Sequence, residues 1–181
     1  AEIRRETDHL KRVLEDFLLF ARPGTARATE VALEGVVRRA AADPALEGAA
    51  VELHRLSADI PSLLGDEQLL EHAFRNLLRN AVRAQSESGR DDPIIVELGR
   101  DAETLFVRIE DRGAGLPEEI GERLFQPFVS GFRGGVGLGL AVSHRIVTLH
   151  GGRLRLLNRT GGGARAEVVF PTGGFVTNRN E

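Results

Sequence analysis

The stretch Asn76-Leu-Leu-Arg-Asn-Ala-Val-Arg-Ala84 lies within the most regular helical pattern of the chain. From residue 66 to about residue 86, apolar side chains recur every three or four positions and form one stripe. Asp66, just before them, has the side chain of an N-cap. The pattern predicts one long amphipathic helix, whose stripe consists of Leu70, Ala73, Phe74, Leu77, Ala81 and Ala84.

Beside this stripe, the helix carries a polar face made of Asn76, Asn80 and Arg83, at spacings of four and three residues. An asparagine carbonyl oxygen can enter the octahedral shell of Mg²⁺, and an arginine one turn later can meet a phosphate group. Asparagine is also tolerated on exposed helix surfaces, so two solvated side chains are the alternative.

A strand pattern leads to an acidic residue followed by glycines. Segments 94–99 and 105–111, joined by a short polar turn, predict a β-hairpin. Alternation places Asp111 on the same face as Val107 and Ile109, which aims its carboxylate towards the core. A buried carboxylate needs hydrogen-bond donors, and the exocyclic amino group of adenine is one candidate. The alternative is that Asp111 ends the strand and caps the turn Asp111-Arg-Gly113-Ala-Gly115.

A glycine-rich stretch, Gly134-Gly-Val-Gly-Leu-Gly-Leu140, runs directly into a helix expected over residues 139–150. Such an arrangement offers backbone N–H groups and the positive end of a helix to an anion, most simply phosphate. The run matches neither a Walker loop nor a Rossmann fingerprint, and a flexible loop is the alternative.

The remaining segments alternate between helix and strand. We expect a strand near Val31, a helix over about 33–42, strands at 51–55 and 62–64, and two last strands at about 153–158 and 164–170. Hairpin-paired strands with helices gathered between them favour an α+β fold, a two-layer α/β sandwich.

One amphipathic helix precedes this sandwich. Its apolar residues recur at steps of four and three, interrupted only by Thr7, and they are Ile3, Leu10, Leu14, Phe17 and Ala21. This seam favours a helical hairpin or dimer stalk over a lone amphipathic helix. Arg22-Pro23-Gly24 ends the helix, so we expect an N-terminal segment at 1–23, a linker at 24–29, the main domain at 30–171 and a tail at 172–181.

The composition of the chain excludes several kinds of partner and site. The 24 Lys and Arg against 27 Asp and Glu give a net charge of -3, without the footprint of a nucleic-acid partner or a polybasic membrane anchor. The absence of cysteine excludes disulfides, thiolate metal sites and cysteine nucleophiles. No apolar run approaches the roughly 20 residues of a membrane span, so we expect a soluble, cytoplasmic domain. Because the chain begins at Ala1 inside a helix, we expect a longer protein around it, and its membrane anchoring stays open.

Four motifs in this order resemble those of two-component sensor histidine kinases. Asn76–Ala84 is similar to the N box, Asp111–Gly115 to the G1 box, Phe125-Gln-Pro-Phe128 to the F box, and Gly135–Leu140 to the G2 box. The resemblance covers about residues 30–171 and implies the Bergerat fold, a mixed sheet with helices on one face, shared more distantly with gyrase, Hsp90 and MutL. Residues 1–22 resemble the second helix of the dimerisation and phosphotransfer hairpin.

The resemblance implies a role for each motif residue. Asn80 would hold Mg²⁺, Asn76 and Asn80 would be catalytic, Asp111 would read the adenine amino group, and residues 116–135 would form a mobile lid. The implied contacts to ATP come from Asn76, Asn80, Arg83, Asp111, Gly113, Gly115, Phe128, Arg133, Gly135, Gly137, Leu138, Gly139 and Leu140. The implied activity moves the γ-phosphoryl group of Mg-ATP to a histidine on the dimerisation helix of a homodimer, and then to an aspartate on a response-regulator receiver domain.

Two positions depart from related proteins. Asn76 stands where gyrase-like and Hsp90-like ATPases carry a glutamate base, which fits transfer to histidine better than transfer to water. Phe132 stands where close relatives with short lids usually carry lysine, which leaves open whether Arg133 supplies the charge to the phosphates.

The phosphoacceptor histidine is expected to lie outside this chain. His9 is a poor candidate, because it lies only about a dozen residues before the break at Arg22-Pro23 and lacks the following proline of the usual motif. We therefore expect the chain to bind nucleotide without phosphorylating itself. A nucleotide-gated interaction module and a water-hydrolysing ATPase are the alternative functions.

Overall fold

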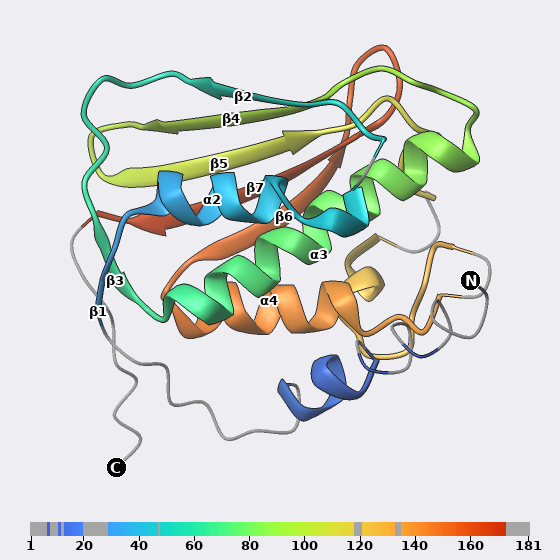
Figure 1. The fold of residues 1–181 in the computed structure, drawn as a ribbon, viewed down its shortest axis with the longest axis horizontal. Coiled ribbons are helices and arrows are strands. Elements are labelled where there is room, and N and C mark those ends of the chain that lie inside the picture. Colours follow the sequence, from blue (N-terminus) through green and yellow to red (C-terminus); the bar gives the residue numbers. More distant parts are fainter. Residues whose placement is uncertain are drawn as a thin grey trace.

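Five strands form one mixed sheet in the order β2-β4-β5-β7-β6 (Figure 1). They are β2 (Val51–Arg55), β4 (Ile94–Arg100), β5 (Thr104–Glu110), β6 (Arg153–Asn158) and β7 (Ala164–Pro171). β2 runs parallel to β4, and the other neighbours are antiparallel. This computed structural model describes residues 7, 11, 13–19, 29–46, 48–117, 121–132 and 135–172.

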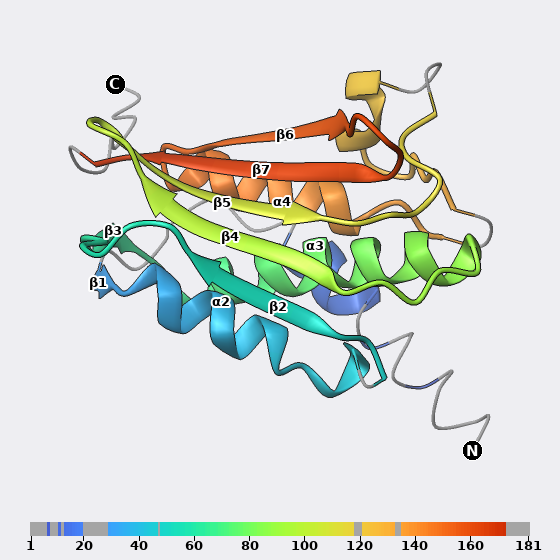
Figure 2. The same cartoon turned by 90° about the horizontal axis from the view of Figure 1, so that it is seen from above.

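Three helices, α2 (Leu33–Ala41), α3 (Glu67–Glu87) and α4 (Gly139–Leu149), cover one face of this sheet (Figure 2). Alternate strand residues, such as Leu105, Val107 and Ile109 of β5, are buried against them. A small antiparallel pair, β1 (Thr29–Val31) and β3 (Leu63–Gly65), lies beside α2. The predicted two-layer α/β sandwich with helices on one face is therefore confirmed.

Two short 3₁₀ helices, η1 (Pro44–Leu46) and η2 (Gly121–Phe125), were not predicted. Asp43 begins the first, because its Oδ1 accepts a hydrogen bond from the N–H of Ala45 at 3.0 Å. Asp43 also pairs with Arg79 of α3 at 2.5 Å. A helix of three residues is too short to give an apolar period, which explains why the sequence pattern did not show it.

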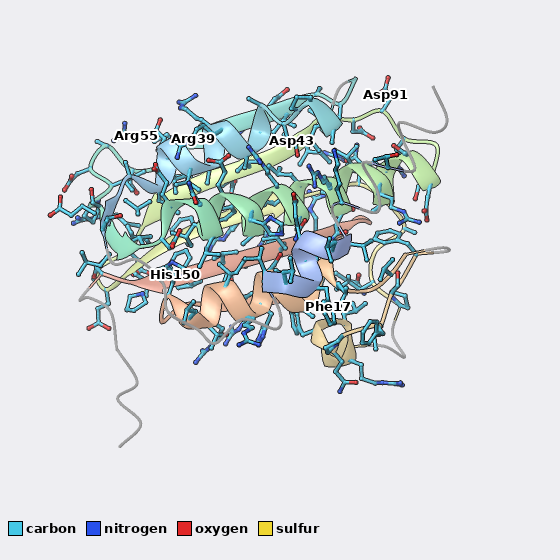
Figure 3. All side chains as sticks on the ribbon, turned by 60° about the horizontal axis from the view of Figure 1, so that its bottom comes forward. Phe17, Arg39, Asp43, Arg55, Asp91 and His150 are labelled. Carbon is cyan, nitrogen blue, oxygen red and sulfur yellow. The ribbon has the colours of Figure 1, made fainter. Side chains whose placement is uncertain are left out.

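A hydrogen bond connects the residue before α3 to the residue after α4. The predicted N-cap is confirmed, since Asp66 Oδ1 accepts the N–H groups of Gln68 and Leu69 at 3.1 and 3.2 Å. Asp66 also donates its own N–H to His150 Nε2 at 2.9 Å, and Nδ1 of this histidine lies 2.7 Å from the carbonyl oxygen of Ile146. Figure 3 shows His150 in this position between the two helices.

Residues 13–19 form a helical segment on the helix side of the sheet (Figure 1). Leu19 packs against the hydrophobic core, whereas Leu14, Phe17 and Leu18 are 57%, 49% and 51% exposed. Figure 3 labels Phe17 on this segment. The outward face therefore includes two residues of the predicted seam. The other seam residues, His9, the break at 22–24 and the tail from 173 onward lie outside the described residues, and the division at 23, 29 and 171 stays a prediction.

Candidate functional site

A cavity of about 490 Å³ opens between α3, the lid, the start of α4 and the N-terminal helix. It is lined by most of the predicted site residues, namely Asn76, Asn80, Arg83, Gly115, Gly135, Gly137, Leu138, Gly139 and Leu140. A smaller hollow of about 70 Å³ shares part of this lining and adds Asp111 together with apolar side chains of α3 and the sheet. The structure thus brings a helix, a strand end and a glycine loop to one place.

Asp111 lies where the smaller hollow meets the sheet. It directly follows β5 and is 6% exposed. Its Oδ1 accepts hydrogen bonds from the N–H groups of Gly113 and Ala164 at 2.8 and 3.1 Å. Within the described residues, no hydrogen bond reaches Oδ2. One oxygen therefore caps the turn, as the alternative interpretation expected, and the carboxylate is buried beside a hollow, as the strand alternation predicted. The adenine contact stays a prediction.

The surroundings of Asp111 shift its pKa in opposite directions. Burial raises the pKa of this carboxyl, whereas the N–H groups of Gly113 and Ala164 and the nearby charge of Arg159 lower it by less. The rest of the hollow is mostly apolar, with Leu77, Ile109 and Leu156 among its walls. A planar apolar ring that carries an amino donor has the chemistry to fill this space.

The turn after Asp111 packs tightly against α3 and β6. A Cβ atom at Gly113 would lie 2.6 Å from the carbonyl oxygen of Ala84, so no larger residue fits there. Gly113 itself does not line either hollow. Asn158, which sequence reasoning missed, clamps the start of the lid by accepting the N–H of Leu116 at 2.6 Å and donating to its carbonyl oxygen at 3.2 Å.

The glycine loop presents the N-terminus of α4 to the larger cavity. Leu138 occupies the N-cap position, and its apolar side chain accepts no hydrogen bond from the backbone N–H groups of the first turn. Gly137 has a φ of 74°, and its carbonyl oxygen accepts the N–H of Phe128 at 3.0 Å. This bond ties the glycine loop to the lid and leaves a helix end suited to an anion.

The polar face of α3 meets this loop. Asn76 is 8% exposed, and its Nδ2 lies 3.5 Å from both the carbonyl oxygen of Gly139 and Oδ1 of Asp16. Asn80 is half-buried and lines both hollows. The alternative of two solvated asparagines on an exposed face is therefore wrong.

Asp16 connects the N-terminal helix to this wall. Its Oδ1 lies 2.7 Å from Nε2 of His72, and Asp16 and Val13 both line the larger cavity. Sequence reasoning missed this contact, because Asp16 lies off the apolar seam and nothing local marks its partner on α3.

Besides Gly113, two further predicted ATP contacts are not among the lining residues of the two hollows. The side chain of Phe128 is 70% exposed and does not line either hollow, although its backbone contacts the glycine loop with a positive φ of 66°. Arg133 lies outside the described residues.

Residues 65–174 match the protein family described as histidine kinase-, DNA gyrase B- and HSP90-like ATPase. The chain belongs to this family. Signal transduction histidine-protein kinase AtoS of Escherichia coli (strain K12) is 28% identical over 173 residues, covering 93% of this chain and 28% of AtoS. Alginate biosynthesis sensor protein KinB of Pseudomonas aeruginosa is 37% identical over 118 residues, covering 64% of this chain and 19% of KinB.

A solved structure agrees with this assignment. The mycobacterial sensor histidine kinase MprB matches with a TM-score of 0.68 and 26% identity, covering 80% of this chain and 97% of the MprB chain. The fold is that of the ATP-binding catalytic domain of a histidine kinase. The chain spans less than a third of the length of AtoS or KinB. Within the described residues, no helix is both long and apolar enough to cross a membrane.

Proposed function

We propose that this chain binds Mg-ATP in the cavity beneath the lid and directs its γ-phosphoryl group to a histidine on a dimerisation helix. The observation that carries the proposal is the convergence of three features on two hollows that share part of their lining. They are the Asp111 carboxylate in an apolar hollow, the N-terminus of α4, and the amides of Asn76 and Asn80. These features suit an adenine ring, phosphate groups and a hard cation respectively.

The residues present fit Mg²⁺ that is bound together with the nucleotide. Within the described residues, no cluster of three or more His, Cys, Asp or Glu side chains is arranged to hold a metal. Mg²⁺ often needs no such cluster, because it keeps several waters and takes one or two protein ligands beside substrate phosphates. We assign Asn80 as this protein ligand, and the ion would neutralise negative charge on the phosphates.

The chain's own residues bind and orient the nucleotide. Asp111 would accept the adenine amino group, and the N–H groups of α4 together with Arg83 would hold the phosphates. Asn76 lies on the same wall, and an amide cannot take a proton from an attacking water. We therefore expect transfer to histidine to be favoured over hydrolysis.

The proposed partners follow from the exposed face of the N-terminal helix and from the relatives. Leu14, Phe17 and Leu18 present apolar surface that a neighbouring helix of a homodimer would cover. AtoS is named as a signal transduction histidine-protein kinase, which supports a response regulator as the final acceptor. A domain that uses ATP needs a cytoplasmic supply, so we place it in the cytoplasm.

Radiolabelled ATP tests this function. The chain alone is expected to bind nucleotide without forming stable phosphohistidine, and label should appear on a dimerisation hairpin of the full-length protein when that hairpin is added in trans. An acceptor His→Ala hairpin is the matched control and should stay unlabelled. Label on His9 of the chain itself would overturn the expectation that the acceptor lies elsewhere.

The two rival functions give other results. Rapid release of inorganic phosphate by the chain alone would indicate an ATPase. Binding of ATP without any label on the added hairpin would indicate a nucleotide-gated interaction module.

A further inference from the structure

Arg83 and Phe132 form a cation–π contact across the larger cavity. The Cζ atom of Arg83 lies 4.7 Å from the centroid of the Phe132 ring, and both side chains line the cavity. Arg83 belongs to α3 and Phe132 to the lid, so the contact joins two walls. The attraction depends on the face of an aromatic ring, which an aliphatic side chain of similar size does not provide.

The backbone of Phe132 is held in place by its neighbours. Ser130 Oγ accepts the N–H of Phe132 at 3.1 Å and donates to its carbonyl oxygen at 3.0 Å. The N–H of Gly135 donates to the same carbonyl oxygen at 3.3 Å. A side chain at residue 135 would collide with Ser130 Oγ, so this turn is closely packed. These contacts therefore fix the position of the backbone that carries the Phe132 ring.

The guanidinium of Arg83 is held on a second side by Glu87. The Nε atom donates to Glu87 Oε1 at 2.8 Å. Its outer end reaches the glycine loop, because a Cβ atom built on Gly135 would lie 3.5 Å from Arg83 Nη1. The cation thus stands beside the loop that faces the start of α4.

The geometry points to Phe132 as a positioning residue for phosphate binding, whose ring holds the Arg83 guanidinium beside Gly135 and the N-terminus of α4. This inference rests on the proposed function, since it assigns the phosphate groups of ATP to that end of the cavity. Arg83 is the group that contacts the nucleotide, and Phe132 acts through it. Because the contact concerns phosphate charge, its effect should grow with the number of phosphate groups and should be absent for adenosine.

Binding of ATP, ADP and adenosine to Phe132→Leu, measured by calorimetry, tests the inference. We expect the Kd for ATP to rise about three- to tenfold, with a smaller rise for ADP and none for adenosine. Phe132→Tyr should restore ATP affinity, because it keeps the aromatic face. Arg83→Ala should weaken ATP binding at least as much, and adding Phe132→Leu to it should cost nothing further.

A second Arg–Phe pair supplies the matched control. Arg108 Cζ lies 4.4 Å from the Phe106 ring centroid on the face of the sheet turned away from the helices. Phe106→Leu should leave ATP affinity unchanged, and melting temperatures without nucleotide show whether each variant folds. Equal losses for ATP and adenosine, additive losses in the double variant, or no loss for Phe132→Leu would overturn the inference. Failure of the wild-type chain to bind any adenine nucleotide would instead overturn the proposed function.

Discussion

Asp111 accepts two backbone hydrogen bonds with one oxygen, while burial raises the pKa of its carboxyl. In Asp111→Asn, the amide carbonyl can keep both bonds, but an NH₂ group replaces the oxygen that would accept the adenine amino group. We expect ATP affinity to fall by about tenfold or more, the loss of a hydrogen bond to a charged group. We expect stability without nucleotide at pH 7 to be equal or higher, because a buried charge is removed. Calorimetry and thermal unfolding measure the two effects.

The pH dependence of this variant has a defined sign. Burial raises the pKa of Asp111 in the folded state. The contribution of this carboxyl group to stability is therefore fully present below the ordinary aspartate pKa, and it is lost as pH rises through the raised value. The melting-temperature advantage of Asp111→Asn should therefore be largest at neutral pH and vanish in acid. An advantage that grew towards acid, or unchanged ATP affinity, would contradict the assignment.

Gly137 holds the glycine loop against the lid. Its φ is 74°, and a Cβ atom there would lie 2.6 Å from the carbonyl oxygen of Val129. In Gly137→Ala the loop must move, and we expect a stability loss of about 1–3 kcal/mol together with weaker ATP binding. Gly161→Ala is the control, because Gly161 has a φ of 95° and no atom of the described residues lies within 4 Å of its Cβ position. It should lose stability through backbone strain and keep its ATP affinity.

At the scale of elements, α3, α4 and the β4–β5 hairpin followed from sequence because their apolar periods are long and Asp66 and the glycines mark their ends. Other features depend on distant partners. The parallel pairing of β2 with β4 joins segments separated by the whole of α3, and Asn158 reaches the lid from β6. The contact of Phe132 was missed for the same reason, because its partner Arg83 lies on a different element.

His150 connects two of these helices and gives a prediction at their scale. Burial lowers the pKa of this histidine, so its Nε2 remains an acceptor for the N–H of Asp66. Its contribution to stability is present above the ordinary histidine pKa of 6.5 and is lost as pH falls through the lowered value. His150→Leu should cost about 1–3 kcal/mol near pH 7.5, because a buried N–H loses its acceptor.

The same variant should show a flatter stability profile below pH 6.5, measured by urea unfolding across that range. His54→Leu is the matched control, since the His54 side chain is 50% exposed on β2. It should have little effect on stability near pH 7.5, because a surface side chain is replaced. A His150→Leu profile parallel to the wild type would contradict the lowered pKa, because it would mean that this histidine binds its proton equally in the folded and unfolded states.

At the scale of the whole molecule, the N-terminal helix and the nucleotide cavity form one continuous structure. Asp16 lies 2.7 Å from His72 Nε2 and 3.5 Å from Asn76 Nδ2, and its side chain is 15% exposed. A carboxylate on the wall of a cavity that receives phosphate groups repels them, and the repulsion is weakly screened where solvent is excluded. Docking of this helix against the cavity should therefore weaken the binding of nucleotide, and bound nucleotide should weaken the docking.

Asp16→Asn removes the negative charge and keeps the contact, because the amide oxygen can still accept a hydrogen bond from His72. We expect ATP affinity to rise about two- to fivefold, with a smaller rise for ADP and little change for adenosine. The gain should shrink in high salt. Glu15→Gln removes the same charge from an exposed neighbour on the same helix and should have little effect. If Asp16→Asn instead weakened ATP binding, the carboxylate would be a partner of Mg-ATP, and helix docking would assist binding rather than oppose it.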